Sequence, residues 1–87
     1  MISTHERSDL IHIMKLNHLS VNDADTAQLC FNGQIRGKKY EITILMVENL
    51  ASVIVKRDGV RVCSETVPSI GDMKIFLEEQ LYQYMEV

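Results

Sequence analysis

Residues 26–67 read TAQLCFNGQIRGKKYEITILMVENLASVIVKRDGVRVCSETV, and apolar side chains recur at every second position through most of this stretch. A period of two is typical of β-strands with one buried face. Glycine-containing pairs suited to tight hairpin turns divide the stretch: Gly37-Lys38 fits a type II′ turn and Asp58-Gly59 a type I′ turn. With a middle turn at Asn49-Leu50, we expect four antiparallel strands at about 26–35, 39–47, 51–57 and 60–66.

The three turns agree on one buried face of this sheet. Opposed residues of an antiparallel pair share a face. The first turn places Phe31 opposite Ile44, the middle turn places Ile44 opposite Val55, and the last turn places Val55 opposite Val62. The side chains expected to face the core are Leu29, Phe31, Ile35, Tyr40, Ile42, Ile44, Met46, Val53, Val55, Val60 and Val62.

A helix is expected before the strands, at about residues 4–17. Ser3 and Glu6 have the spacing of a capping box, and apolar residues follow at helical intervals. Residues 20–25, with the sequence SVNDAD, are rich in turn-forming residues and are expected to form a loop.

A second helix is expected after the strands, at about residues 69–85. Pro68 marks the break from the last strand, and Ser69 and Asp72 have the capping-box spacing with aspartate in place of glutamate. Its core-facing stripe is expected to contain Ile70, Met73, Phe76, Leu77, Leu81 and Tyr84.

Together these elements predict an α+β fold with the order αββββα, in one domain spanning residues 1–87. Its expected form is a two-layer sandwich, in which a four-stranded antiparallel meander carries the N-terminal and C-terminal helices on one face. The composition, 46 % apolar and 24 % charged, is that of a soluble globular domain. There is no apolar run of ~18 residues and no signal-peptide core, so we expect a cytoplasmic protein without a membrane segment.

Motifs for catalysis or cofactor binding are missing from the sequence. It has no GxGxxG, Walker, GxSxG, HExxH or CxxC pattern. Cys30 and Cys63 are expected on opposite edge strands, ~14 Å apart, which is too far for a disulfide. His5 and His12 lie two helical turns apart, too far for joint metal ligation. We therefore expect neither an enzyme nor a cofactor or metal site.

The outer face of the predicted sheet is polar apart from one apolar row. The expected register aligns four residues across all strands, namely Cys30, Leu45, Ile54 and Cys63. Three explanations remain open: ordinary solvent-facing apolar groups, a protein-binding surface, or a helix that covers this face.

The second helix offers another candidate for binding. Ile75 and Tyr82 are seven residues apart, opposite the core stripe, with Glu78, Glu79 and Glu86 around them. An aromatic and an aliphatic side chain inside an acidic rim would suit an interface anchor. Scattered exposure is the alternative.

Basic residues concentrate at one end of the sheet, because the first and third turns lie at the same end. Six of the nine flank these turns: Arg36, Lys38, Lys39, Lys56, Arg57 and Arg61. This cluster would suit the phosphates of nucleic acid or an acidic protein surface. The alternative is that it protects the sheet edges against aggregation.

These features predict a small cytoplasmic protein-interaction module, acting by surface binding as a regulator, inhibitor or adaptor. Its partner would be another protein or a second copy in a homodimer, and its size would fit a phage- or plasmid-type accessory role. The alternative is a nucleic-acid-binding protein that uses the basic end, although the net charge of −3 argues against it.

Overall fold

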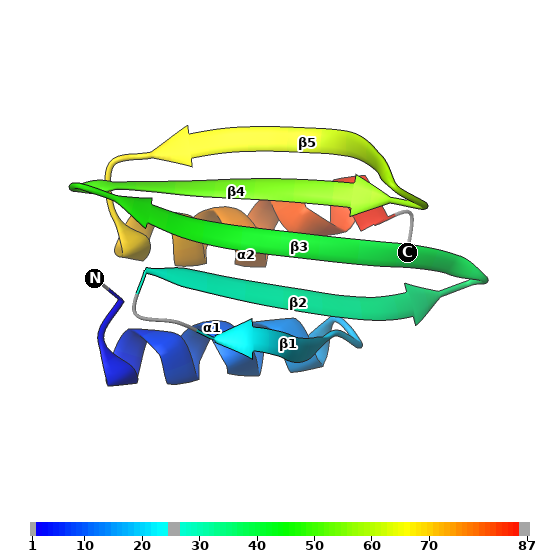
Figure 1. Ribbon diagram of the computed structural model, residues 1–87, viewed down its shortest axis with the longest axis horizontal. Coiled ribbons are helices and arrows are strands. Elements are labelled where there is room, and N and C mark those ends of the chain that lie inside the picture. The colour runs from blue at the N-terminus through cyan, green and yellow to red at the C-terminus, as the bar shows by residue number, and fades with distance from the viewer. Residues whose placement is uncertain (1, 25–26, 86–87) are drawn as a thin grey trace.

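Three tight turns fold residues 28–67 into four neighbouring antiparallel strands, as the alternating pattern predicts. The computed structural model describes residues 2–24 and 27–85 (Figure 1). In chain order the elements are α1 (Thr4–Leu16), β1 (Ser20–Ala24), β2 (Gln28–Ile35), β3 (Lys38–Val47), β4 (Leu50–Arg57), β5 (Val60–Val67) and α2 (Ile70–Met85). The strands follow one another in the sheet in sequence order, and every neighbouring pair is antiparallel.

The sheet has five strands rather than the expected four, because Ser20–Ala24 forms β1 and not a loop. This edge strand pairs with β2, with Ser20 opposite Asn32 and Val21 opposite Phe31. The prediction of a loop was wrong because SVNDA shows no apolar alternation. Its strand conformation comes from backbone pairing with β2, which sequence pattern alone does not record. The expected start of the next strand, at about Thr26, lies outside the described residues.

The first hairpin turn lies one residue earlier than the expected Gly37-Lys38. It consists of Arg36-Gly37, whose φ angles of 52° and 80° indicate a type I′ turn. Phe31 therefore lies opposite Ile42 instead of Ile44.

The middle turn is displaced in the same way, from the expected Asn49-Leu50 to Glu48-Asn49. Ile44 therefore lies opposite Val53 instead of Val55. Each displacement by one residue moves the partner by two positions. Because side chains alternate with a period of two, the predicted buried face of β2, β3 and β4 is preserved.

The last hairpin contains the predicted Asp58-Gly59 turn, with φ angles of 51° and 83°. A β-bulge then shifts the register, so that Val55 lies opposite Cys63 and not Val62. Cys63 is consequently buried, whereas Val62 is half-buried and Val60 is 64 % exposed. The predicted inward face of this strand was therefore wrong.

Both helices cover the same face of the sheet, as Figure 1 shows. The strands contribute these buried side chains to the core: Leu29, Phe31, Ile35, Tyr40, Ile42, Ile44, Ala51, Val53, Val55 and Cys63. The helices contribute Leu10, Ile13, Met14, Ile70, Met73, Phe76, Leu77, Leu81 and Met85. Met46 and Tyr84, expected in the core, are only half-buried. Among residues 2–24 and 27–85, no helix covers the opposite face of the sheet, which we call the open face.

Helix α1 begins and ends with recognisable caps. Ser3 and Glu6 form the predicted capping box, with hydrogen bonds of 3.1 Å from Glu6 N to Ser3 Oγ and 3.0 Å from Ser3 N to Glu6 Oε1. At the other end His18 has φ 63°, and Leu19 N donates to Met14 O at 2.9 Å. This Schellman-type ending directs the chain from α1 into β1.

Helix α2 is fixed at both ends. Asp72 N donates to Ser69 Oγ at 3.1 Å, as the sequence predicts for an N-cap serine. At the C-terminal end the buried Tyr40 hydroxyl donates to Met85 O at 2.6 Å. This hydrogen bond links the sheet to one of the carbonyl groups that a helix end leaves without an intrahelical donor.

Candidate functional site

The open face of the sheet carries no second layer in the described part of the chain. Six uncharged side chains of β2, β3 and β4 occupy its centre, and all six are half-buried. We call them the central patch: Gln28, Cys30, Thr43, Leu45, Ser52 and Ile54. No charged residue lies among them, so a partner could cover this patch without desolvating a charge from it.

The apolar row predicted across this face does not form. Cys30 lies opposite Thr43 and not opposite Leu45, and Ile54 lies between Thr43 and Ser64. The two displaced turns cause this change, because each moves the cross-strand partners by two positions. Leu45 and Ile54 remain on the open face as diagonal neighbours, because Leu45 lies opposite Ser52 and Ile54 opposite Thr43.

Cys63, the fourth member of the predicted row, lies on the other face. The bulge in β5 turns it toward the helices, where it is 7 % exposed. Burial raises the pKa of its thiol, and a hydrogen bond with Tyr84 opposes this rise in part. Its predicted place in a partner-binding surface was therefore wrong.

The polar members of the central patch bond to one another or to a neighbouring strand. Gln28 Nε2 donates to Cys30 Sγ at 3.0 Å, and the hydroxyl oxygens of Ser52 and Thr66 are 3.1 Å apart. Because these groups are already paired within the sheet, covering them costs less than covering unpaired polar groups. The patch therefore combines apolar side chains with polar ones that already hydrogen-bond within the sheet.

Two exposed apolar residues extend the patch toward the β3–β4 turn. Val47 is 58 % exposed and Leu50 is 49 % exposed, and they pair with each other on the same face as Leu45. Leu50 was not identified from the sequence as part of this face, because it was expected in the middle turn. The structure places it in β4, so its side chain belongs to the open face.

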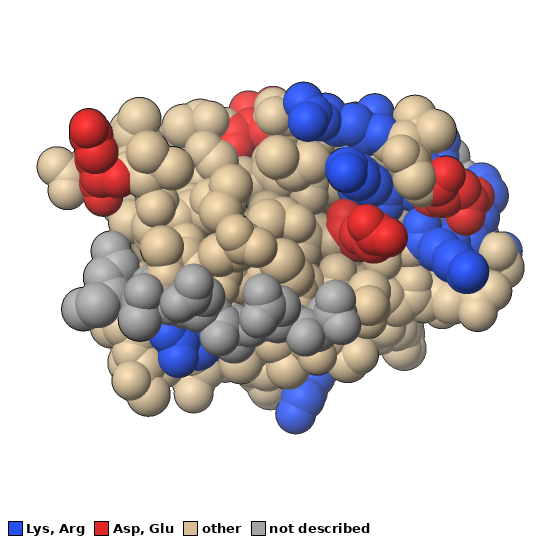
Figure 2. Space-filling model, viewed as in Figure 1, with Lys and Arg blue, Asp and Glu red and all other residues tan. Residues whose placement is uncertain are grey.

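The predicted basic cluster does gather at the other end of the sheet, around the β2–β3 and β4–β5 turns (Figure 2). Lys39, Lys56 and Arg61 are exposed on the open face. Arg36 is exposed in the first turn, and Lys38 and Arg57 are half-buried.

Two hydrogen bonds tie Asp58 of the β4–β5 turn to Lys39 at the start of β3. Lys39 N donates to Asp58 Oδ1 at 2.9 Å, and Asp58 N donates to Lys39 O at 2.7 Å. These bonds join the β4–β5 turn to the start of β3, next to the β2–β3 turn, so the two groups of basic residues lie on directly bonded segments.

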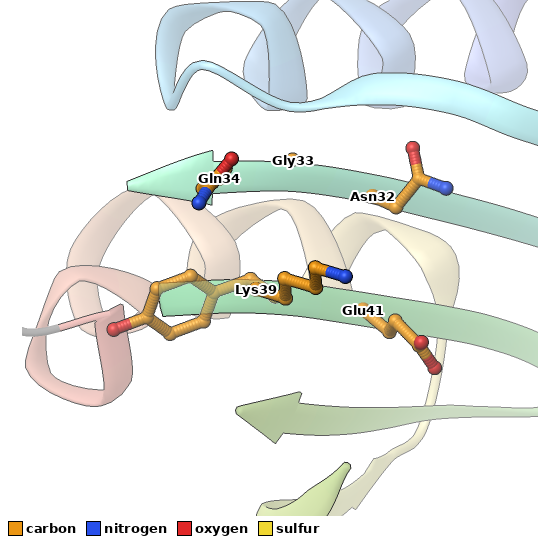
Figure 3. Close-up of a pocket in the computed structure, with 6 residues that line it drawn as sticks. Asn32, Gly33, Gln34, Lys39 and Glu41 are labelled. Carbon is orange, nitrogen blue, oxygen red and sulfur yellow. The ribbon is translucent and has the colours of Figure 1, made fainter. Parts of the chain in front are cut away.

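A shallow hollow of about 400 Å³ lies within this end, over β2 and β3 (Figure 3). Asn32, Gln34, Lys39 and Glu41 project from the two strands around it, as the figure shows. A carboxylate and an ammonium group in one open hollow favour neither an anion nor a cation, so the hollow does not define a ligand class.

The charge of the molecule is strongly segregated. At the basic end, six basic side chains face two acidic ones, Glu41 and Asp58, which gives a formal charge of +4. The other three basic and ten acidic side chains give −7 for the rest of the chain, consistent with the total of −3. A segregation of this size favours binding of an acidic surface at the basic end.

The outer surface of α2 carries the second predicted candidate. Ile75 is 54 % exposed and Tyr82 is 57 % exposed, and Glu78 and Glu79 are exposed beside them, whereas Glu86 lies outside the described residues. The predicted exposure of this apolar pair is confirmed, whereas its role in binding stays a prediction.

The histidines lie in or beside α1, whereas Cys30 and Cys63 lie on opposite faces of the sheet. His5 Nε2 lies 3.6 Å from Asp9 Oδ2 at the surface of α1. Among residues 2–24 and 27–85, no group of three or more histidine, cysteine, aspartate or glutamate side chains could hold a metal ion. In the same residues, neither helix is long and apolar enough to cross a membrane.

Comparisons with protein-family models, curated proteins and solved structures found no match for this chain.

Proposed function

We propose that this protein is a small cytoplasmic protein-interaction module that binds its partner through the open face of the sheet. One observation carries the proposal: both helices cover one face, and the other presents the central patch together with Val47 and Leu50. Such a module would act as a regulator, inhibitor or adaptor by occupying a surface of its partner, without chemistry of its own.

The character of this face supports a protein partner. Protein interfaces combine an apolar centre with a charged rim, and they are depleted of charge at the centre. The open face resembles this in part, with Leu45 and Ile54 in the uncharged central patch and the charged side chains gathered toward the basic end. Full burial of a leucine or isoleucine side chain contributes ~1.5–3 kcal/mol, and these two half-buried side chains would contribute part of that each.

The test compares lysine substitutions on the two sides of the molecule. Immobilised wild-type protein and the Leu45→Lys, Ile54→Lys and Ser8→Lys variants would each be exposed to nuclease-treated lysate of the native host. Ser8 is exposed on α1, so its substitution adds the same charge away from the open face. We expect a protein that the wild type and Ser8→Lys retain and that both open-face variants lose.

Circular dichroism would establish that all the variants are folded. If every variant retained the same proteins as the wild type, binding would not involve the open face. If nothing bound specifically to the wild type, the proposed interaction would be absent under those conditions and the proposal would fail.

The segregated charge supports nucleic acid as a second candidate partner. A duplex or single strand lying across the basic end would meet Lys39, Lys56 and Arg61 on the open face. Wild-type protein should then bind a labelled oligonucleotide with an affinity that falls steeply as salt rises. The Lys39→Glu/Lys56→Glu variant should lose this binding, and wild-type protein that ignores the oligonucleotide at low salt would exclude the candidate.

A further inference from the structure

Two exposed surfaces of this chain complement each other in polarity and charge. The open face has an apolar part, which includes Leu45 and Ile54, beside the basic end. The outer surface of α2 has an apolar pair, Ile75 and Tyr82, beside carboxylates. Both surfaces are uncovered within one copy of the described chain.

The solvent-facing surface of α2 is acidic, and the single basic residue of this helix does not neutralise it. Asp72, Glu78 and Glu79 are exposed, whereas Lys74 Nζ lies 3.0 Å from Asp9 Oδ2 of α1. Lys74 therefore pairs with a carboxylate of α1 and does not neutralise the carboxylates of α2. The surface that α2 presents outward is therefore anionic, and the basic end of the open face is cationic.

The dimensions of the two surfaces also match. Helix α2 has 16 residues and is ~24 Å long, and the eight-residue strands β2, β4 and β5 span ~26 Å. A helix lying along a sheet is a standard way to cover an apolar sheet face. A helix of this length can reach from the apolar part of the open face to its basic end.

We propose that the open face of one copy binds the outer surface of α2 of a second copy, so that the protein assembles head to tail. This inference rests on the proposed function, because it names the partner of the same open face. Opposite charges favour this contact between the sheet and the helix. If two open faces packed together with their basic ends superimposed, the basic ends would repel each other. Because the two contacting surfaces are different, each copy can bind one neighbour with its sheet and another with its helix. Such contacts produce rings or open chains rather than a closed dimer.

The expected association is weak and sensitive to salt. The helix covers a strip of roughly 24 × 10 Å, which is small compared with the ~800 Å² per partner of a standard interface. Exposed charge pairs are screened as ionic strength rises. Purified protein should therefore self-associate at high concentration and low salt, and should dissociate as salt is added.

Two charge-reversed variants test the arrangement. The sheet variant is Lys56→Glu/Arg61→Glu, and the helix variant is Glu78→Lys/Glu79→Lys; all four side chains are exposed, so both variants should fold. Sedimentation at up to about 1 mM protein detects even a millimolar dissociation constant. We expect the wild type to exceed its monomer mass of 10.0 kDa and each variant alone to remain monomeric. An equimolar mixture should associate again, because each variant supplies the surface that complements the other.

Three results would overturn the inference. Wild-type protein that stays monomeric over the whole range has no such interface. A helix variant that associates as strongly as the wild type would show that α2 is not the partner surface, as in a face-to-face dimer of sheets. A mixture of the folded variants that stays monomeric would exclude the proposed charge pairing. None of these results bears on retention of a host protein by the open face, which the lysine variants test separately.

Discussion

Gly33 is a residue whose identity follows from the contact between β2 and the end of α1. A Cβ atom at this position would lie 2.6 Å from His18 O and 2.9 Å from Leu19 Cδ2. Neither atom can move easily, because His18 belongs to the Schellman-type ending of α1 and Leu19 is buried. Gly71 differs, since a Cβ there would meet only Ser69 Oγ, at 3.6 Å.

Alanine at these two positions should therefore have opposite effects on stability. Gly33→Ala should lower the free energy of unfolding by about 1–3 kcal/mol, the usual cost of overpacking. Gly71→Ala should raise it by up to about 1 kcal/mol, because alanine is the better helix former. Urea denaturation measures both. Equal stability of Gly33→Ala and the wild type would contradict the close approach of β2 to His18.

The two cysteines should differ in reactivity, because they lie on opposite faces of the sheet. Cys30 is half-exposed on the open face, whereas Cys63 is buried under α2 and has a raised pKa. In native protein a thiol reagent such as DTNB should modify Cys30 quickly and Cys63 only on unfolding. The Cys30→Ser variant should thus show one slow thiol. Rapid modification of that variant would contradict the position of Cys63.

At the scale of elements, turns and bulges have different consequences for prediction. Both misplaced turns moved cross-strand partners by two, so the buried faces of β2, β3 and β4 were predicted correctly. The bulge moved them by one, so Cys63 changed face and Val62 is only half-buried against the core. Alternating apolar residues still identify the buried face of a strand when its cross-strand partners are displaced by an even number of positions. The alternation does not locate a bulge, because the extra residue of a bulge is not marked by any change in the residue types of the strand.

The contact between α1 and α2 provides a pH dependence with a definite sign. The hydrogen bond from Lys74 lowers the pKa of Asp9 below its ordinary value of 3.8, and the charges of Lys74, His5 and His12 lower it further. A carboxyl group with a lowered folded-state pKa stabilises the fold above its unfolded-state value. This contribution is lost as the pH falls through the folded-state pKa.

The Asp9→Asn variant should therefore lose less stability on acidification than the wild type. The measurement is the urea midpoint at about pH 6, above the ordinary pKa value of 3.8, and at about pH 2, below it. Glu6 also has a lowered pKa through its hydrogen bonds with Ser3, so the variant should retain part of the acid sensitivity. An unchanged difference between the two pH values would show that the Asp9–Lys74 pair does not contribute.

At the scale of the whole molecule, the sequence predicted the position of the basic end correctly, but it did not predict which side chains lie opposite one another across the strands. The basic end follows from strand order alone, because alternate turns of any meander lie at the same end. The apolar row required the register to be correct at every turn, and two of the three turns were displaced. The central patch therefore became visible only with the structure, and Leu50 joined the open face for the same reason.

The two-layer architecture makes a sharp prediction for neighbouring residues of β3. Ile44 is fully buried between the sheet and the helices, and Leu45 is half-buried on the open face. Ile44→Lys should unfold the protein, because it buries a charge and removes core contacts. Its cost should reach several kcal/mol, comparable to the ~5–15 kcal/mol total stability of a domain. Leu45→Lys places the same charge one residue away, where solvent can hydrate it, and should preserve the far-UV circular dichroism with a modest fall in Tm. Unfolding by both substitutions would mean that another layer covers the open face, and neither a protein partner nor a second copy could then bind there.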